Sequence, residues 1–380
     1  MSDRSEASCL KKTIALTTFF VCGAFSSVLS NILYCMESKG LHNIVKPFRK
    51  PWFQVWGMFV AMTLLIFNTS FIKTCKCQKY KIGDPICGIG LFRIVSLPAL
   101  CDNMATILST VALLYLAPSI WQMMRGSALI FTAIFTIFYR HRRLNLVDWI
   151  GVSITVLGLV IIGVSSLVAT KKGVGNSGSS VILQIISFVL ILVAQALQAF
   201  QCILEEEFLH DIDATESEIV AYEGVWGLFI TSFIMMPLAN IIPESWGEGL
   251  FEQSIESFVM VAHSWQIFLL MIFYIIVIAG FNQAGMTVIE FSSAIHKNIY
   301  EALRSIAVWV LSVIVHYIWP SSEAGESITM MSLVQLAGFI VMIIGSFIYN
   351  RVIPLKCLEK DNIEETTKTD FDQPLNPDLM

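Results

Sequence analysis

The sequence predicts an all-α membrane protein with ten transmembrane helices, and two observations lead to that class. Of the 380 residues, 56% are hydrophobic and only 14% are charged, whereas soluble proteins carry roughly 25% charged residues. Apolar runs of about 20 residues, the length that crosses a bilayer as a helix, recur along the chain. This composition excludes a nucleic-acid-binding protein, a secreted disulfide-linked scaffold and a cytosolic enzyme.

Each of the ten apolar runs is long enough to span the membrane. The first run is longer than the roughly 7–15 apolar residues of a signal peptide, and no small-residue cleavage site follows it, so it counts as a span. In chain order the runs are 13–36, 52–72, 92–116, 119–139, 146–168, 181–208, 218–242, 265–286, 292–318 and 329–350.

The distribution of Lys and Arg over the loops predicts the orientation. Thirteen of these residues lie on the side of the N-terminus and six on the opposite side, and cytoplasmic loops are the richer ones. We therefore expect both termini in the cytosol, with residues 1–12 as a cytosolic N-terminus and 351–380 as an acidic cytosolic tail. The loop 243–263, which has no Lys or Arg, then faces the lumen or the exterior.

An internal repeat relates the two halves, 13–170 and 181–350. Arg125 opens RGSALIF in the fourth span, and Arg304 opens RSIAVWV in the ninth. The fifth and tenth spans each contain two glycines seven residues apart, Gly151 with Gly158 and Gly338 with Gly345, a spacing that lets helices approach closely. Halves of five spans lie in opposite orientations, and such inverted repeats are typical of alternating-access transporters with a solute site near the midplane. The predicted fold is thus two inverted five-helix repeats.

Polar side chains inside the spans are costly, so each is a candidate for the site. Three of them are cations, which suit a solute with carboxylate or phosphate groups. Four neutral side chains complete the predicted substrate site. The candidates are Arg125, Arg304, Lys297, Gln122, Asn103, Asn282 and Asn298.

Four carboxylates are candidates for proton coupling or gating, a role that buried acids fill in transporters: Asp102, Glu301, Glu223 and Glu206. A structural alternative remains open, because Glu301 is spaced to neutralise Lys297 and Arg304 along one helix. Asp102 and Arg125 could likewise pair across a short hairpin. The glutamines 195, 198 and 201 are equally compatible with contacts between helices.

Neither a metal site nor a cofactor is expected. Cys75, Cys77 and Cys87 share one loop, but without a nearby histidine they fall short of the four ligands of a structural zinc. The six histidines are dispersed, so no catalytic set is recognisable and the protein is not expected to be an enzyme.

Several stretches resemble the drug/metabolite transporter superfamily. They are LPALCDNMATILSTVALLYLAPSIWQMMRGSALIFTAIFTIFYRHRRL, QCILEEEFL, AYEGVWGLFITSFIMMP and FNQAGMTVIEFSSAIHKNIYEALRSIAVWVLS. Within that superfamily the chain is similar to solute carrier family 35, F subgroup, and there to its lysosomal, nucleotide-sugar-transporter-like branch. It departs from that pattern at His296-Lys297, where Thr-Arg is expected.

The resemblance implies an EamA-type fold of five plus five spans, with the fourth and ninth spans at the centre. It also implies an endomembrane location, either lysosome or vacuole, or Golgi. Related proteins that resemble the chloroquine-resistance transporter move amino acids, peptides or cationic drugs.

The first interpretation of function is therefore a secondary active transporter of a small anionic metabolite, nucleotide-sugar-like, working by alternating access. The alternative is a vacuolar or lysosomal exporter of amino acids, peptides or cationic solutes driven by proton coupling, and the net charge of the central cavity separates the two. A third class is a non-transporting scaffold, in which Arg125 and Arg304 are salt-bridged in a closed core. The expected partners are a small-molecule solute and the lipid bilayer, with no nucleic acid and with a homodimer left open.

Overall fold

The computed structural model describes residues 2–41, 43–67, 78–79, 85–86, 88–113, 115–116, 118–140, 145–171, 181–210, 215–242, 252–318, 329–349 and 352–353. The three cysteines at 75, 77 and 87 and almost all of the acidic tail 351–380 lie outside these residues.

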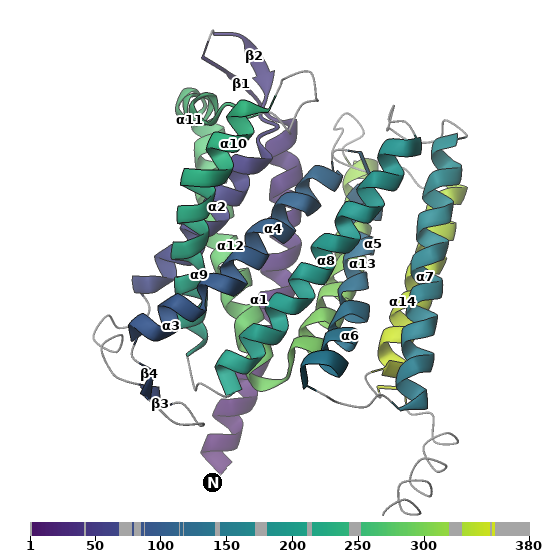
Figure 1. Ribbon diagram of the computed structural model, residues 1–380. Coiled ribbons are helices and arrows are strands. Elements are labelled where there is room, and N and C mark those ends of the chain that lie inside the picture. Colours follow the sequence, from purple (N-terminus) through teal and green to yellow (C-terminus); the bar gives the residue numbers. More distant parts are fainter. Residues whose placement is uncertain are drawn as a thin grey trace, which may run out of the picture.

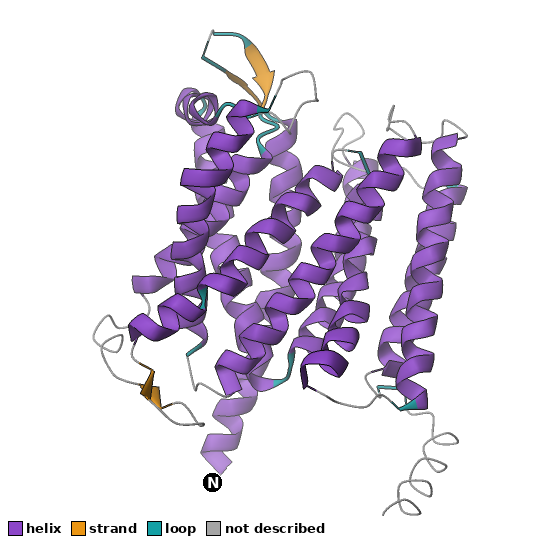
Figure 2. Ribbon diagram, viewed as in Figure 1, coloured by secondary structure: helices purple, strands orange, loops and turns teal. Residues whose placement is uncertain are grey.

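The described chain is mostly helical (Figures 1 and 2). The α-helices are α1 (Ser2–Cys35), α2 (Pro51–Leu64), α3 (Gly88–Ile94), α4 (Ser96–Leu113), α5 (Pro118–Met124), α6 (Ala128–Arg140), α7 (Leu146–Lys171), α8 (Val181–His210), α9 (Glu216–Ile230), α10 (Met236–Ile241), α11 (Ser254–His263), α12 (Trp265–Phe291), α13 (Ala294–Ile318) and α14 (Met330–Tyr349). Three short turns continue neighbouring helices: the 3-10 turns η1 (Leu65–Phe67) and η2 (Arg125–Ser127) and the π-turn η3 (Thr231–Met235).

Two small antiparallel hairpins lie at opposite ends of the helix bundle (Figure 1). Strands β1 (Glu37–Lys39) and β2 (Val45–Pro47) form one hairpin, which lies with α11 at the end far from the N-terminus. Strands β3 (Gln78–Lys79) and β4 (Pro85–Ile86) form the other, at the end where the N-terminus lies. The second half of the loop predicted at 243–263 forms a helix, α11.

Within the described residues, eight helical segments are long and apolar enough to cross a membrane, which agrees with the all-α membrane class that the composition predicted. They are Leu10–Cys35, Gly90–Ala112, Ile120–Phe138, Leu146–Val168, Ile182–Leu209, Glu216–Ile241, Trp265–Phe291 and Met330–Tyr349. The two other predicted spans are also helical. Pro51–Phe67 is a shorter apolar helix, and α13 carries the charged residues Lys297, Glu301 and Arg304.

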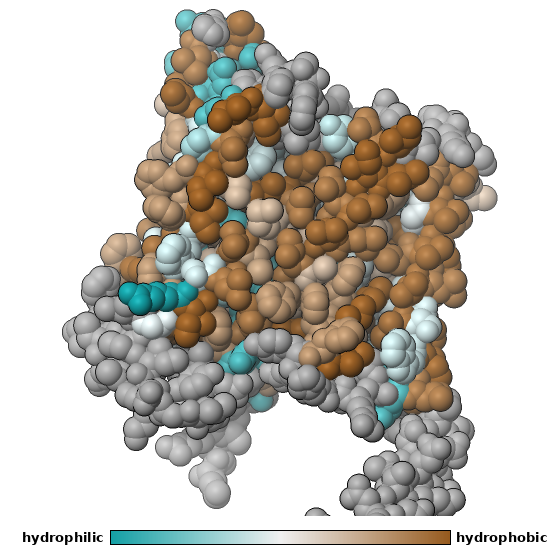
Figure 3. Space-filling view, in the orientation of Figure 1, coloured by the Kyte–Doolittle hydropathy of each residue, from teal (hydrophilic) through white to brown (hydrophobic). Residues whose placement is uncertain are grey.

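The outer surface of the bundle is apolar, as Figure 3 shows by the hydrophobic residues that cover the middle of this face. Large apolar side chains point away from the protein on several helices, for example Ile182, Phe233 and Trp265, which are about 70% exposed. A soluble protein rarely exposes so wide an apolar surface, whereas a bilayer is a favourable solvent for it.

The predicted glycines bring α7 and α14 into close contact at one edge of the bundle (Figure 1). A methyl group on Gly158 would overlap the backbone of Gly338 and Met342, and one on Gly345 would overlap the backbone of Gly151. Only residues without a Cβ allow two helix backbones to approach so closely. The spacing of the glycine pairs therefore predicted a real helix contact.

The other long helices also pack in pairs, α1 against α12, α2 against α9 and α4 against α8. The remaining helix, α13, contacts α1, α5 and α6. This arrangement surrounds the charged residues of α13 with other helices and keeps them away from lipid.

Candidate functional site

A cavity of about 260 Å³ lies inside the helix bundle. Residues from the turn η2 and from α1, α2, α4, α5, α6, α8, α9, α12 and α13 form its wall, whereas no described residue of α7 or α14 does. Along α13 the wall runs from Lys297 to Trp309, a distance of about 18 Å at 1.5 Å per residue. Nine of the eleven candidates from the sequence line this cavity: Asp102, Gln122, Arg125, Glu223, Asn282, Lys297, Asn298, Glu301 and Arg304.

The two other candidates lie outside the cavity wall and hold helices together. Asn103 is fully buried, and its Oδ1 accepts a hydrogen bond of 2.8 Å from the Thr231 hydroxyl, which links α4 to η3. Glu206 Oε2 accepts a hydrogen bond of 3.0 Å from the backbone N–H of Ala294 and thereby caps α13. A solute in the cavity would not contact either side chain in this conformation.

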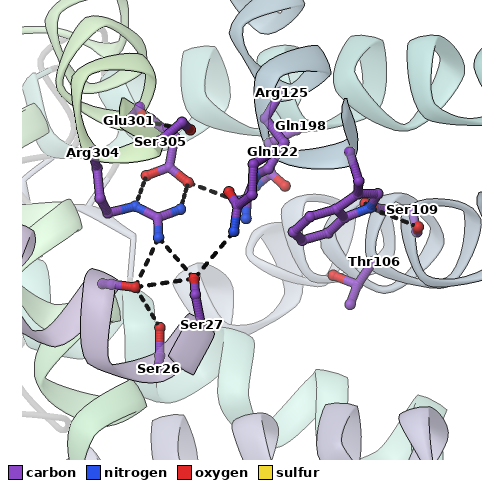
Figure 4. A network of polar contacts seen from close by, with 12 residues as sticks. Ser26, Ser27, Thr106, Ser109, Gln122, Arg125, Gln198, Glu301, Arg304 and Ser305 are labelled. Carbon is purple, nitrogen blue, oxygen red and sulfur yellow. Dashed lines mark hydrogen bonds and ion pairs between the residues drawn. The ribbon is translucent and has the colours of Figure 1, made fainter. Parts of the chain in front are cut away.

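Two charged clusters lie on the cavity wall, and Arg304 is buried in the first of them. Its side chain is 1% exposed, with Nη2 lying 2.6 Å and Nε 3.2 Å from the two carboxylate oxygens of Glu301. Nη1 donates to the carbonyl of Gly23 and to the Ser27 hydroxyl (Figure 4). A side chain on Gly23 would collide with Arg304 and Phe281, so glycine is needed at this position of α1.

Arg125 approaches the same carboxylate from the opposite side (Figure 4). Its Nη2 lies 2.8 Å from Glu301 Oε1, its side chain is 22% exposed, and its guanidinium lies over the Trp121 ring. It begins the 3-10 turn η2 between α5 and α6, and such a turn within a helix often marks a hinge. Arg125 is thus the more accessible of the two arginines.

A second charged cluster lies about two helical turns away, around Lys297. Lys297 Nζ donates to Glu205 Oε2 at 3.2 Å. The other oxygen of Glu205 accepts a hydrogen bond of 2.6 Å from Gln201, whose own Oε1 accepts one of 3.0 Å from Gln198. All four side chains line the cavity, and Glu205 is 1% exposed.

Two more carboxyl groups line the cavity near this second cluster, and the structure gives neither of them a salt bridge within the described residues. Asp102 is buried and accepts one long hydrogen bond of 3.4 Å from Thr106. Glu223 is 1% exposed, and its Oε1 has no hydrogen-bond partner among the described residues. Buried polar atoms are normally paired, so these oxygens are the natural contacts for a bound group.

The amide side chains among the candidates divide into those that hold helices together and those that have an unpaired polar atom. Asn298 donates to the Thr132 hydroxyl at 2.7 Å and so holds α13 to α6. Gln122 donates to the Ser27 hydroxyl at 3.3 Å, whereas its Oε1 has no partner in the described part of the chain. The buried Nδ2 of Asn282 likewise has no hydrogen-bond partner among the described residues. Gln122 and Asn282 therefore present polar atoms that a solute could satisfy.

The charges of the wall add up to a polarised cavity. Two arginines and one carboxyl, Glu301, form the first cluster, and one lysine and three carboxyls, Asp102, Glu205 and Glu223, line the second. The formal net charge of these seven residues is −1. The prediction of an anion site counted the cations but not Glu205, because a run of three glutamates at the end of a span is typical of a solvated helix end. The spacing of Gln198, Gln201 and Glu205, by three and four residues on one helix face, was the available signal.

Two further polar clusters tie helices together at the ends of the bundle. At the N-terminal end Lys11 Nζ lies 2.7 Å from Glu216 and 2.9 Å from Glu290, which joins α1, α9 and α12. At the other end Glu252 is 1% exposed and accepts hydrogen bonds from the backbone N–H groups of Trp52 and Phe53 at the start of α2.

Burial raises the pKa of Glu252 to about 7, although the Ser257 hydroxyl, the charge of Lys50 and the two backbone N–H groups act in the opposite direction. Its neighbour Glu256 behaves differently. Partial burial raises the pKa of Glu256, but hydrogen bonds and charge from Lys50 and Lys46 outweigh burial and bring it below its ordinary value.

Comparisons with known proteins give relatives over most of the chain. The human protein "Solute carrier family 35 member F6" is 32% identical over 308 residues, which cover 80% of this chain and 78% of that one. The rat protein of the same name is 28% identical over 307 residues. An uncharacterized protein of Schizosaccharomyces pombe is 29% identical over 269 residues, or 70% of this chain.

Two other comparisons add little. No family model matches the sequence. A solved crystal structure aligns with 91% of this chain at 10% identity and a TM-score of 0.46, a likeness that supports no argument about the fold.

Proposed function

The chain belongs to solute carrier family 35, and on that premise we propose that it is a secondary transporter of a small zwitterionic or amine-bearing solute, working by alternating access. The observation that carries the proposal is the charge of the cavity. Every cation on its wall forms a salt bridge with a carboxylate, while Asp102 and Glu223 form no salt bridge with a cation among the described residues. Membership of this family supports a transporter rather than an enzyme.

An ammonium group is the charge that this cavity lacks. A buried carboxylate is costly without a counter-charge, and a solute with an amine would supply one to Asp102 or Glu223. An anion would instead have to displace Glu301 from two arginines or Glu205 from Lys297. The surplus positive charge of the first cluster remains available to the carboxylate of a zwitterion, through Arg125.

The size of the cavity also favours a small solute. Its volume of about 260 Å³ lies below the roughly 300–1,000 Å³ of sites for drug-sized ligands. An amino acid or short peptide fits this scale better than a nucleotide sugar does.

The anionic metabolite predicted from the sequence remains the second candidate, and one observation favours it. Arg125 is partly exposed to the cavity and belongs to a cluster with two cations and one carboxylate. A solute carboxylate or phosphate could share these cations with Glu301.

We propose ten spans in two inverted repeats for the transport mechanism. Exchange of the two halves would map spans 1 to 5 onto spans 6 to 10. The helix pair α1–α12 would become α8–α4, while α2–α9 and α7–α14 would each map onto themselves. All four of these pairs are in contact, as a pseudo-twofold axis requires.

For the location, we propose an endomembrane, either lysosome or vacuole, or Golgi, with both termini in the cytosol. The excess of Lys and Arg on the N-terminal side supports this orientation. Protease protection of N- and C-terminal epitope tags in sealed organelles tests it, since both tags should be cleaved without detergent.

In this proposal the candidate residues have distinct roles. Asp102 and Glu223 supply the negative charge that attracts the ammonium group, or they carry the coupling proton. Arg125 binds a carboxylate, and Gln122 and Asn282 donate or accept hydrogen bonds. Arg304 positions Glu301, while Asn298, Asn103 and Glu206 hold helices in place.

The test is uptake by the purified protein in liposomes. Labelled amino acids and dipeptides are compared with nucleotide sugars and inorganic phosphate, with and without an inward proton gradient. Saturable uptake of a zwitterion or amine, at least tenfold weaker in Asp102→Asn, is the expected result. Asp148→Asn is the matched control, because Asp148 is equally buried but lies outside the cavity.

Two outcomes would contradict the proposal. Saturable uptake of a nucleotide sugar or phosphate, with no uptake of any zwitterion, would select the anionic alternative. No transport of any solute by the folded wild type, together with misfolding of Arg125→Ala, would favour the non-transporting scaffold.

A further inference from the structure

The buried pair of Lys297 and Glu205 resembles a carboxylate site that already holds a primary ammonium group. Lys297 Nζ lies 3.2 Å from Glu205 Oε2, and both residues line the cavity. We propose that Glu205 binds the ammonium group of the solute, and that Lys297 is a tethered substitute cation which holds this site while the transporter is empty. This inference rests on the proposed function, because it names the part of the solute that the cavity recognises.

The carboxylate is positioned from the side that Lys297 does not use. Gln198 donates to Gln201, and Gln201 donates to Glu205 Oε1 at 2.6 Å, so the three side chains form a hydrogen-bonded row along α8. A glutamate fixed in this way keeps its orientation when the cation on its other oxygen changes. The row therefore holds Glu205 so that its Oε2 can exchange the ammonium group of Lys297 for that of the solute.

Lys297 has the freedom that exchange requires. Its side chain is 19% exposed, whereas that of Glu205 is 1% exposed, so the lysine is the partner with open space beside it. A Cβ on Gly285 would lie 3.4 Å from Lys297 Cε and equally far from the Phe19 ring, which shows that the lysine stem passes over a residue with no side chain. Asp102 and Glu223 lie within electrostatic range of both Glu205 and Lys297. A displaced ammonium group thus has other carboxylates to move to.

The next residue, Glu206, has a different role from the one that we propose for Glu205. Glu206 also lies at the end of α8, but its Oε2 accepts from the backbone N–H of Ala294 and it does not line the cavity. Two adjacent glutamates therefore have different roles, one toward the solute and one as a helix cap. Glu206→Gln keeps an acceptor oxygen for the cap and serves as the matched control for Glu205→Gln.

The role of Lys297 as a substitute cation has a consequence for transport. An empty carrier without Lys297 would have to change its conformation with Glu205, Asp102 and Glu223 around a cavity that holds no cation at this end, which is unfavourable. A carrier loaded with an ammonium group avoids that state. Loss of Lys297 should then slow the return of the empty carrier more than the exchange of solute for solute.

The first experiment measures the binding of propylammonium, a mimic of the lysine side chain, to the full-length protein in detergent. Fluorescence of the cavity residues Trp121 and Trp309 or a thermal shift reports occupancy. Lys297→Ala should bind propylammonium about tenfold more tightly than the wild type, Glu205→Gln should lose this binding, and Glu206→Gln should resemble the wild type. Equal or weaker binding to Lys297→Ala overturns the proposal. If Lys297→Ala does not fold, Lys297→Gln, which keeps a hydrogen-bond donor for Glu205, replaces it, and the same two binding results support or overturn the proposal.

The second experiment uses liposomes and the best amine-bearing substrate of the uptake screen. Lys297→Gln should keep at least half of the wild-type rate of exchange of external for internal substrate, while its net uptake falls about tenfold. The double variant Glu205→Gln/Lys297→Gln should regain net transport of an uncharged analogue of the substrate. Equal losses of exchange and net uptake in Lys297→Gln contradict the substitute-cation role. The two proposals fail separately, because absence of all zwitterion uptake refutes the proposed function, whereas the propylammonium result depends only on the site.

Discussion

Replacement of Arg304 by alanine should destabilise the fold of this protein rather than remove a binding site. The substitution removes the two contacts to Glu301 and the donors to the Gly23 carbonyl and the Ser27 hydroxyl, all in a place where the side chain is 1% exposed. Breaking one side of a buried ion pair costs about 3–5 kcal/mol, and a buried carbonyl left unpaired costs about 1–3 kcal/mol. Because Arg125 still pairs with Glu301, we expect a total of about 3–5 kcal/mol, a large part of the 5–15 kcal/mol that typically stabilises a fold.

Arg125→Ala is the comparison that makes this prediction sharp. Arg125 is 22% exposed, and Arg304 keeps Glu301 paired when it is removed, so the loss should be about 1 kcal/mol. Thermal unfolding of both variants in detergent, together with uptake per folded molecule in liposomes, separates the two roles. Arg304→Ala should melt early, whereas Arg125→Ala should fold and transport poorly. The reasoning is refuted if Arg304→Ala melts with the wild type, or if Arg125→Ala is the less stable of the two.

Three further predictions concern residues outside the cavity. Because the pKa of Glu252 is raised from 4.5 to about 7 by burial, the folded state binds its proton more tightly than the unfolded chain, so stability here is greatest in acid and is lost as the pH rises through 7. The opening free energy of the Trp52 amide, from hydrogen exchange, should fall by about 2–3 kcal/mol between pH 5 and pH 8 in the wild type and should not change in Glu252→Gln. Gly158→Leu should separate α7 from α14 and lower the yield of folded protein, whereas Gly163→Leu, where a Cβ meets nothing, should not. Lys11→Gln should loosen the contact of α1 with α9 and α12. It should thereby raise the reactivity toward maleimide of Cys22, a partly buried thiol of α1 that faces Gly280 of α12, and unchanged reactivity would show that this ion pair does not close the N-terminal end.

The sequence predicted best what depends on local pattern. Apolar runs set the position of the helices. The glycine pairs Gly151–Gly158 and Gly338–Gly345 indicated a close helix contact, and the structure shows that the contact joins α7 to α14. Two helix ends moved clearly. The first span was expected to begin at 13, but α1 begins at Ser2. The eighth span was expected to end at 286, but α12 continues to Phe291, because Met286–Phe291 is apolar apart from Thr287 and Glu290, and Glu290 pairs with Lys11.

Partners between distant spans could not be predicted in the same way. The spacing of Glu301 and Arg304 along one helix did indicate their pairing, as one of the alternatives weighed. The contact of Arg125 with Glu301 and that of Lys297 with Glu205 join residues 176 and 92 positions apart, and no helical period connects them. Glu206 was singled out and Glu205 was not, although one residue of rotation, about 100° around a helix, directs Glu205 to the cavity and Glu206 to the start of α13.

These long-range partners also decide which charge the solute should have. A cavity inside a membrane cannot hold several unpaired cations when it is empty, because each would lie in a medium of low dielectric constant. Every conspicuous arginine or lysine in a span is therefore expected to have a carboxylate nearby, and its presence alone says little about the solute. The informative quantity is the charge that remains after pairing. Here the overall remainder is negative and lies with Asp102 and Glu223, while the first cluster keeps one positive charge, so the solute that we propose brings a positive group.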